Sequence, residues 1–416
     1  MSEITAVRSR FPIFQSPEQR DLVYFDSGAT TQKPAEVIEA IREYYLHATA
    51  NVHRGVYDLA DKSTTLWEES RKTIAHFVGV EADELILTRN TTEAINGVVY
   101  GWGEHKVSSA DVIVVSGMEH HANLVPWQEL AKRKGAQLEI LPVDTAGQVK
   151  LSDLEVLLQN KSVALVAIAH VSNVLGSVVD VQAIAHLIKR VNRDRGSSTR
   201  LLVDGAQAVP HLEVDVKKLG ADFYVFSGHK MYGPMGIGAL IVRQELLNSG
   251  EMTPWLYGGG MIEQVQSYSA TYSDNLSDRF TAGTPDVASA VGLAAACRFL
   301  TEIGMSAIAD HSRELVRQAW HILSEHNEVE LIGPDPNSYA RTASVAFVHR
   351  SVHAHDVAQV FNSEHVAVRS GHHCAMPLHT QFKWSATTRL SFGVYNNSTE
   401  LEKIPVVLEK IKKLFT

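Results

Sequence analysis

Seven short apolar runs constrain the fold of this chain more than any other feature. Each has the length and composition of a buried strand. The runs cover residues 84–88, 111–116, 137–143, 163–172, 200–205, 222–228 and 238–243. Amphipathic stretches at 124–135 and 181–196 lie between several of them, and the second ends in basic residues and a glycine, as helices commonly do. This alternation predicts an α/β fold built around a mostly parallel sheet.

The pattern changes after about residue 295. Long helix-like segments follow there, mixed with strand-like runs at 341–349 and 387–395. We therefore expect a smaller α+β domain at this end of the chain, joined by the first residues. The predicted boundaries are 24–295 for the large domain, and 1–23 with 296–416 for the small one.

The composition excludes several classes of protein. The chain is 45% hydrophobic and 20% charged, as in ordinary globular enzymes. Its net charge of −9 and the absence of Lys or Arg runs argue against binding to nucleic acid or anionic membranes. The N-terminus has no apolar signal segment, and no apolar run approaches about 18 residues. We therefore expect a cytoplasmic protein with small-molecule or protein partners.

Reactive side chains follow five of the seven runs, where ligands bind in doubly wound sheets. Lys230 follows the run at 222–228, and burial there would lower its pKa and let it form a Schiff base. Asp204 ends another run and could hold a pyridinium nitrogen protonated, so that pyridoxal 5'-phosphate (PLP) acts as an electron sink. Taken singly, each residue is more often a surface lysine or a turn cap.

The motifs taken together resemble one family. "NVHRG", "TTEAIN", "EHHAN", "VDGAQ", "SGHKMYGP", "AGTP" and "RSGHHCAMP" occur in this order. The chain resembles the group II cysteine desulfurases of the SufS/CsdA type, from about residue 24 to residue 397. These are PLP-dependent relatives of the class V aminotransferases. The resemblance implies PLP fold type I, with a mostly parallel seven-stranded sheet, a smaller C-terminal domain and a homodimer.

The resemblance also implies a role for each residue near the cofactor. Lys230 would bond covalently to PLP and move the α-proton of the substrate. Asp204 would pair with the ring nitrogen, Gln207 with the phenolic oxygen, and His121 would stack on the ring and relay protons. A phosphate dianion suits a helix N-terminus. The expected phosphate ligands are Thr92, Ser227 and His229, with Thr284 contributed by the neighbouring subunit.

Only two cysteines occur, too few for a disulfide framework or a thiolate zinc site. We expect Cys297 to be a small buried hydrophobic residue. Cys374 follows Gly, His and His in a polar, basic stretch that favours a thiolate. Three adjacent residues do not readily face one tetrahedral ion, so we expect no metal there.

Cys374 has a coherent role facing a PLP-bound substrate, because it can attack the substrate sulfur. The products would be alanine and a persulfide on Cys374. The short loop around Cys374 suggests a shielded persulfide. A dedicated acceptor of the SufE or SufU/IscU-like type would collect the sulfur for iron–sulfur cluster or related cofactor assembly.

Four residues are candidates for binding the substrate. Arg389 and Asn173 suit the substrate carboxylate, a task for which the planar guanidinium is well shaped. Arg369 would position the Cys374 loop or help to hold the substrate, and Arg54 would lie near the site of the partner subunit. Any single arginine of this kind can instead be part of a surface salt bridge.

Alternatives to a cysteine desulfurase remain open at this stage. A selenocysteine lyase would use the same residues, so the sequence does not rank the two substrates. A partner-bound paralogue could serve as a scaffold with little turnover, although the joint presence of Lys230, Asp204, His121 and Cys374 argues against it. A plain class V aminotransferase would not require Cys374.

Overall fold

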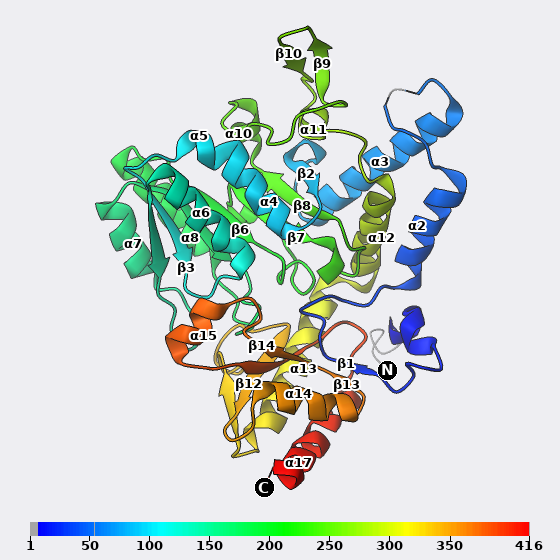
Figure 1. Ribbon diagram of the computed structural model, residues 1–416, viewed down its shortest axis with the longest axis vertical. Coiled ribbons are helices and arrows are strands. Elements are labelled where there is room, and N and C mark those ends of the chain that lie inside the picture. Colours follow the sequence, from blue (N-terminus) through cyan, green and yellow to red (C-terminus); the bar gives the residue numbers. More distant parts are fainter. Residues whose placement is uncertain (1–6, 54, 416) are drawn as a thin grey trace.

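The computed structural model describes residues 7–53 and 55–415, and its centre is a seven-stranded sheet (Figure 1). The strand order is β2-β8-β7-β6-β5-β3-β4. Strand β8 is antiparallel to both of its neighbours, and the remaining neighbours are parallel. The strands are β2 (Leu85–Thr88), β3 (Val112–Ser116), β4 (Gln137–Leu141), β5 (Val163–Ala169), β6 (Arg200–Asp204), β7 (Phe223–Ser227) and β8 (Gly238–Val242).

This sheet confirms the predicted fold class, and every predicted run contributes one strand. Most of the runs are buried because helices cover both faces of the sheet. The exception is the edge strand β4, which is not the buried strand that its sequence predicted, since only Leu141 is buried there. Helices α4 (Thr91–Val98) and α6 (Val125–Lys134) pack on one face, and α8 (Val181–Arg195) and α12 (Val287–Ile303) on the other. The run at 163–172 is the one that extends furthest past its strand, because Val171 pairs locally with Val178 instead.

The two helices expected from amphipathic stretches are present, and each ends as its sequence indicates. Gly135 after α6 and Gly196 after α8 both adopt the left-handed conformation, with φ of 67° and 65°. The other helices of this part are α2 (Ala35–His47), α3 (Asp58–Phe77), α5 (Glu104–Lys106), α7 (Leu151–Asn160), α9 (Val216–Leu219), α10 (Gln244–Asn248) and α11 (Leu276–Arg279). Short 3₁₀ turns include η5 (His121–Asn123) and η6 (Gly228–Lys230).

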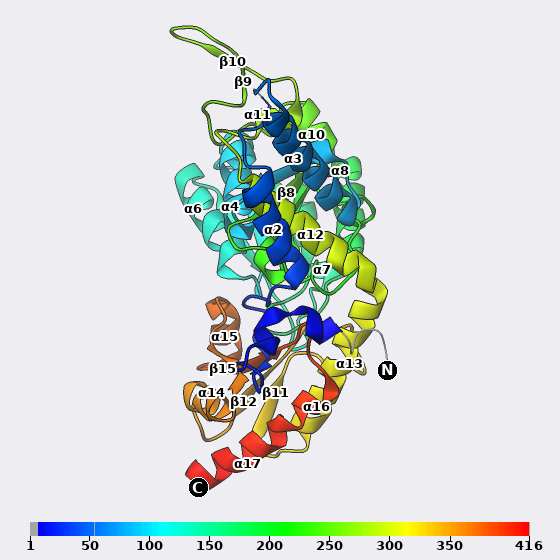
Figure 2. The same cartoon turned by 90° about the vertical axis from the view of Figure 1, so that its right-hand side faces the viewer.

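A second, antiparallel sheet lies beside the first, below it in Figures 1 and 2. Its order is β11-β12-β15-β14. The strands are β11 (Val329–Ile332), β12 (Ser344–His349), β14 (Arg369–Gly371) and β15 (Thr387–Ser391). Helices α13 (Met305–Ser324), α14 (Ala354–Ser363) and α17 (Lys403–Phe415) contribute to its separate apolar core. The short helices α15 (Met376–Phe382) and α16 (Ser398–Leu401) complete this part of the chain.

The N-terminal segment lies against this smaller part. Strand β1 (Val23–Tyr24) pairs in parallel with β13 (Val366–Ala367). At the opposite end of the molecule, β9 (Ile262–Val265) and β10 (Ala270–Tyr272) form a projecting hairpin (Figures 1 and 2). The domain boundaries given above stay a prediction. Among the described residues no single helix is long and apolar enough to cross a membrane; α12 and α13, bent by 79°, pass that test only together.

Candidate active site

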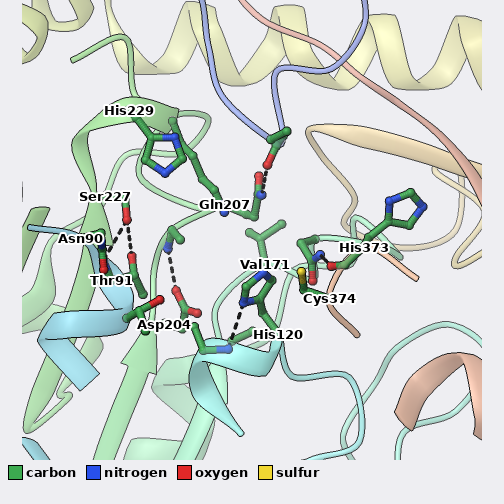
Figure 3. A pocket seen from close by; sticks show the side chains of 18 of the residues that line it. Asn90, Thr91, His120, Val171, Asp204, Gln207, Ser227, His229, His373 and Cys374 are labelled. Atoms are coloured by element: carbon green, nitrogen blue, oxygen red, sulfur yellow. Dashed lines mark hydrogen bonds between the residues drawn. The ribbon is translucent and has the colours of Figure 1, made fainter. Parts of the chain in front are cut away.

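A cavity of about 280 Å³ lies where the carboxyl ends of β5, β6 and β7 face the smaller sheet. Of the predicted site residues that the structure describes, it collects all except His121 and Thr284. Figure 3 shows side chains from both sheets arranged around it. The residues that line it include Gly28, Asn90, Thr91, Thr92, His120, Asn173, Asp204, Gln207, Ser227, His229, Lys230, Arg369, His373, Cys374 and Arg389.

Lys230 and Asp204 lie on the floor of this cavity, at the ends of neighbouring strands. Lys230 ends η6 directly after β7, and burial lowers the pKa of its amine to about 8. Asp204 ends β6, and its Oδ1 accepts a hydrogen bond of 2.9 Å from the Ala206 N–H. Burial raises the pKa of Asp204, and the nearby charge of Lys230 opposes that shift. The floor therefore offers a readily deprotonated amine and a buried carboxylate.

The N-terminus of α4 is tied to the end of β7 beside this floor. Asn90 caps the helix, because its Oδ1 accepts a hydrogen bond of 3.0 Å from the Glu93 N–H. Ser227 Oγ accepts from the Thr91 N–H at 2.8 Å and lies 2.7 Å from Thr91 Oγ1. Thr92 lines the cavity one residue further along. Hydroxyls and a helix N-terminus at one spot are suited to binding a phosphate.

The structure places His120, and not His121, in the cavity, so the expected position of the ring-stacking histidine moves by one residue. His120 is the N-cap of η5, and its Nδ1 accepts a hydrogen bond of 3.0 Å from the Ala122 N–H. Burial, followed by the positive charge of Lys230, lowers the pKa of His120 to about 3. The ring is therefore neutral with its proton on Nε2, and its pKa is not the near-neutral value expected for a proton relay.

His121 faces the cysteine loop instead. Its backbone N–H donates to the Cys374 carbonyl at 2.7 Å. Its ring Nε2 accepts from the Met376 N–H at 3.1 Å. The two neighbouring histidines thus have different positions, one in the cavity and the other against the backbone of the loop.

Cys374 lies in the connection between β14 and α15, and it is exposed in the single chain while also lining the cavity. His373 and Cys374 both have positive φ angles, 50° and 56°, which are uncommon for residues other than glycine. Asn173 Nδ2 donates to the His373 carbonyl at 2.7 Å. Residues that follow strands of the larger sheet therefore hold two successive carbonyls of the loop, those of His373 and Cys374.

Two arginines form the cationic side of the cavity. Arg389 is buried, donating from Nη1 to the Asn173 carbonyl at 2.9 Å and from Nη2 to Asp26 at 3.2 Å. Arg369 lies opposite Arg389 in the pairing of β14 with β15. Gly28 leaves room for this guanidinium, because a Cβ there would lie 3.0 Å from Arg389 Nη2. Two guanidinium groups with one nearby carboxylate suit a carboxylate ligand.

Thr284 and Cys297 lie away from this cavity. Thr284 lines a second cavity of about 240 Å³ with His53 and Gly259, and this cavity shares no lining residue with the first. Arg54 lies outside the described residues. Cys297 is buried in α12, where burial raises the pKa of its thiol, in agreement with the expectation of a small buried hydrophobic residue.

Glu119 is a further residue that supports the site, and it was not predicted from the sequence. This side chain is fully buried, and burial raises its pKa to about 8. It accepts hydrogen bonds from Asn123 Nδ2 at 2.6 Å, from the Ala169 N–H at 2.9 Å and from the Ser116 hydroxyl. Glu119 thereby fixes the turn that carries His120. An acidic residue three positions after the end of a buried strand was the available signal.

The donor set of the cavity fits PLP. An aldehyde needs an amine, a pyridine nitrogen needs a carboxylate, a phosphate needs several donors, and the ring needs a flat neighbour. Lys230, Asp204, the N-terminus of α4 with Ser227, and the neutral ring of His120 supply these groups. Gln207 is fixed by a hydrogen bond of 2.8 Å from Nε2 to the Gly28 carbonyl and also lines the cavity.

Comparison with known proteins agrees with this fit. Residues 23–404 match the family "Aminotransferase class-V". "Probable cysteine desulfurase 2" of Mycobacterium leprae is 45% identical over 409 residues, which cover 97% of this chain and 95% of that protein. The chain therefore belongs to the class-V aminotransferase family, in its cysteine desulfurase branch.

Solved structures of the same branch share the whole fold. A cysteine desulfurase from Thermococcus onnurineus superposes with a TM-score of 0.90 at 40% identity, covering 98% of each chain. The cysteine desulfurase CsdA of Escherichia coli superposes with a TM-score of 0.89 at 32% identity, covering 100% of each chain. The similarity to CsdA agrees with the group II resemblance seen in the sequence motifs.

Proposed function

We propose that this protein is a PLP-dependent cysteine desulfurase, which converts L-cysteine to L-alanine and takes up the sulfur as a persulfide on Cys374. The observation that carries the proposal is that Cys374 lines the same cavity as Lys230 and Asp204. A thiol in that position supports sulfur removal over transamination, which needs no such group. Full-length similarity to cysteine desulfurases points in the same direction.

Each side of the cavity has a separate task in this reaction. PLP, when bound, withdraws electrons from the α-carbon of the substrate. Lys230 accepts and returns protons at that carbon, which its lowered pKa allows near neutral pH. Arg389 and Arg369 bind the substrate carboxylate, and Asn173 holds Arg389 and the cysteine loop in place. His120 presents a neutral ring to the face of the cofactor.

The sulfur-transfer step needs both the cofactor side of the cavity and the cysteine loop. The Cys374 thiolate attacks the sulfur of the substrate, an S–S bond forms, and the Cβ–S bond breaks. The electrons of the broken bond stay with the substrate, whose Cβ gains a proton, so the carbon is reduced by two electrons and the two sulfur atoms are each oxidised by one. The products are L-alanine and Cys374–S–SH. Holding both sulfur atoms in one cavity gives this thiol its advantage over a thiol in solution.

The partners are also part of the proposal. A homodimer would bring Thr284 of one subunit to the phosphate of the other, and the separate cavity around Thr284 is consistent with a role outside its own site. A SufE or SufU/IscU-like protein would then collect the sulfur. Cys374 is exposed in the single chain, so any shielding of its persulfide would come from another chain. Full activity of a monomeric species in sedimentation would contradict the dimer.

The test is to incubate the purified holoenzyme with L-cysteine and a reductant, and to measure alanine and sulfide. We expect equal amounts of both, and a persulfide on the peptide that contains Cys374 by mass spectrometry. Absence of alanine although PLP is bound would contradict the proposal. The same assay with L-selenocysteine measures the alternative lyase activity.

A further inference from the structure

Two buried histidines share one threonine hydroxyl behind the cysteine loop. Thr387 Oγ1 lies 2.9 Å from His373 Nε2 and 3.1 Å from His379 Nε2. Thr387 is fully buried and begins β15, opposite Gly371 at the end of β14. His379 lies in α15, on the other side of the loop. Of the three residues only His373 lines the cavity, and Thr387 and His379 lie behind it.

When both rings are neutral, the shortest hydrogen bonds of the cluster follow one order; the Gly371 carbonyl, 3.4 Å from Thr387 Oγ1, is a more distant second acceptor. His379 Nδ1 lies 3.0 Å from the Ala375 carbonyl, which can only accept, so this nitrogen carries the proton. His379 Nε2 therefore accepts from the Thr387 hydroxyl. That hydroxyl has used its single proton and in turn accepts from His373 Nε2–H. His373 Nδ1 is left without a proton, and it has no partner among residues 7–53 and 55–415.

Burial keeps both rings neutral. The pKa of His373 falls well below its ordinary value, first through burial and then through the charges of Arg389, His379 and Arg369. The pKa of His379 is also lowered, with burial as its largest cause and the neighbouring His372 as a smaller one. The series of hydrogen bonds from the Ala375 carbonyl through His379 and Thr387 to His373 therefore keeps one donor-to-acceptor direction in the folded protein.

These hydrogen bonds fix the conformation of the loop that carries Cys374. Residues 373 and 374 both adopt the left-handed conformation, which their own side chains do not favour. The ring of His373 points away from the cavity, whereas the Cys374 sulfur lies on the side of His120 (Figure 3). Anchoring the ring through Nε2 therefore fixes the backbone from which the thiol projects in the other direction.

We propose that Thr387 and His379 are positioning residues, which through His373 hold the Cys374 thiol where it meets the substrate sulfur. This proposal rests on the function proposed above. It adds two residues that contact neither the substrate nor the cofactor. Their effect falls on the sulfur step, while binding of PLP and of the substrate carboxylate depends on other side chains.

The central test is Thr387→Val, which removes the hydroxyl and keeps the shape of the side chain. We expect the kcat for alanine formation from L-cysteine to fall about tenfold, the scale of a lost buried hydrogen bond, with KM changed less than about twofold. The visible absorption of bound PLP should not change. Alkylation of Cys374 by iodoacetamide, followed by mass spectrometry, should be no slower than in the wild type, because a loosened loop stays exposed.

Two further variants separate positioning from general destabilisation. Thr387→Ser keeps the hydroxyl and should recover most of the lost kcat. Thr388→Val is the matched control, because Thr388 is buried in the same strand and its hydroxyl bonds to the Ala354 carbonyl, on the other side of β15. We expect Thr388→Val to retain wild-type kcat within about twofold, since it touches no part of the cluster.

His379→Leu provides an independent measurement should the valine variant fold poorly. If both residues act through one hydrogen bond, the double variant should lose no more activity than the worse single variant. Unchanged kcat in Thr387→Val, no recovery in Thr387→Ser, or an equal loss in Thr388→Val would overturn the proposal. Failure of the proposed function itself is distinguishable, because then the wild type forms no alanine.

Discussion

The floor of the cavity and the cysteine loop are held in place by different kinds of interaction. Lys230 and Asp204 on the floor follow directly from strands of one sheet, and the sheet fixes their positions. Cys374 stands on a backbone of unfavourable conformation, which bonds from Asn173 and His121 hold from the side of the larger sheet. The floor therefore gets its geometry from secondary structure, and the loop gets its geometry from tertiary contacts.

This difference indicates a division of labour that substitutions can test. Changes on the floor should alter how PLP is bound, which its absorption spectrum reports. Changes in the loop should leave that spectrum unchanged and reduce sulfur uptake. The cavity would then consist of two parts, and substitutions could abolish sulfur uptake in one part without disturbing cofactor binding in the other.

The largest effect should come from Lys230→Ala on the floor. We expect loss of the covalently held cofactor and a fall in alanine formation of roughly 10⁴-fold or more, as for other groups that act covalently. Borohydride reduction of the wild type followed by peptide mapping should label Lys230. Labelling of another lysine would show that the floor is assigned incorrectly.

Cys374→Ser should have the next largest effect, and it tests the loop. A hydroxyl cannot take up sulfur as a persulfide, so we expect alanine formation from L-cysteine to fall roughly 10²-fold or more with an unchanged cofactor spectrum. Turnover of L-selenocysteine should fall less, because the weaker C–Se bond needs less help from a nucleophile.

Cys297→Ser is the control for the loop, because this thiol is buried and its raised pKa makes it inert. Alanine formation in this variant should match the wild type. A persulfide found on Cys297, or full activity in Cys374→Ser, would remove the distinction between floor and loop as drawn here.

The adjacent histidines give a smaller and more selective comparison. His120→Gln should shift the cofactor spectrum and lower kcat by roughly 30-fold, because His120 lines the floor. His121→Gln should lower kcat only a few-fold and leave the spectrum unchanged, because the His121 ring bonds to the loop and does not line the cavity. A reversed pattern would restore the assignment made from the sequence.

The smallest effect concerns pH. The lowered pKa of Lys230, about 8, means that the amine is mostly protonated below that pH and mostly neutral above it. Only the neutral amine bonds to PLP, so cofactor uptake by the apoprotein should speed up about fivefold from pH 7 to pH 8 and level off above about pH 9. A rate that keeps rising tenfold per pH unit to pH 10 would indicate an ordinary lysine.

The sequence predicted the floor better than the loop, for a physical reason. An apolar run followed by Lys or Asp puts that residue at the end of a strand, so the positions of Lys230 and Asp204 follow from their own neighbourhood, whereas their roles rest on the motifs taken together. Which of two adjacent histidines turns inward depends on a turn anchored by the buried Glu119, and no local pattern decides it.

The sequence also did not predict the hydrogen-bonded residues that lie behind the loop. Thr387 and His379 are separated from Cys374 by 13 and 5 positions in a stretch with no periodic pattern. Their meeting with His373 depends on the pairing of β14 with β15 and on the direction of α15. Such contacts come from tertiary structure, which spacing along the chain does not encode.

The bonds from Asn173 and His121 to the cysteine loop also limit how this enzyme can be recombined with its relatives. They join the loop to residues about 200 and 250 positions earlier in the chain. A chimera that exchanged only the C-terminal third would separate the loop from both anchors. The position of the catalytic thiol therefore depends on segments that are far apart in the sequence. Exchanging the C-terminal segment alone would replace the loop without replacing the two residues that anchor it.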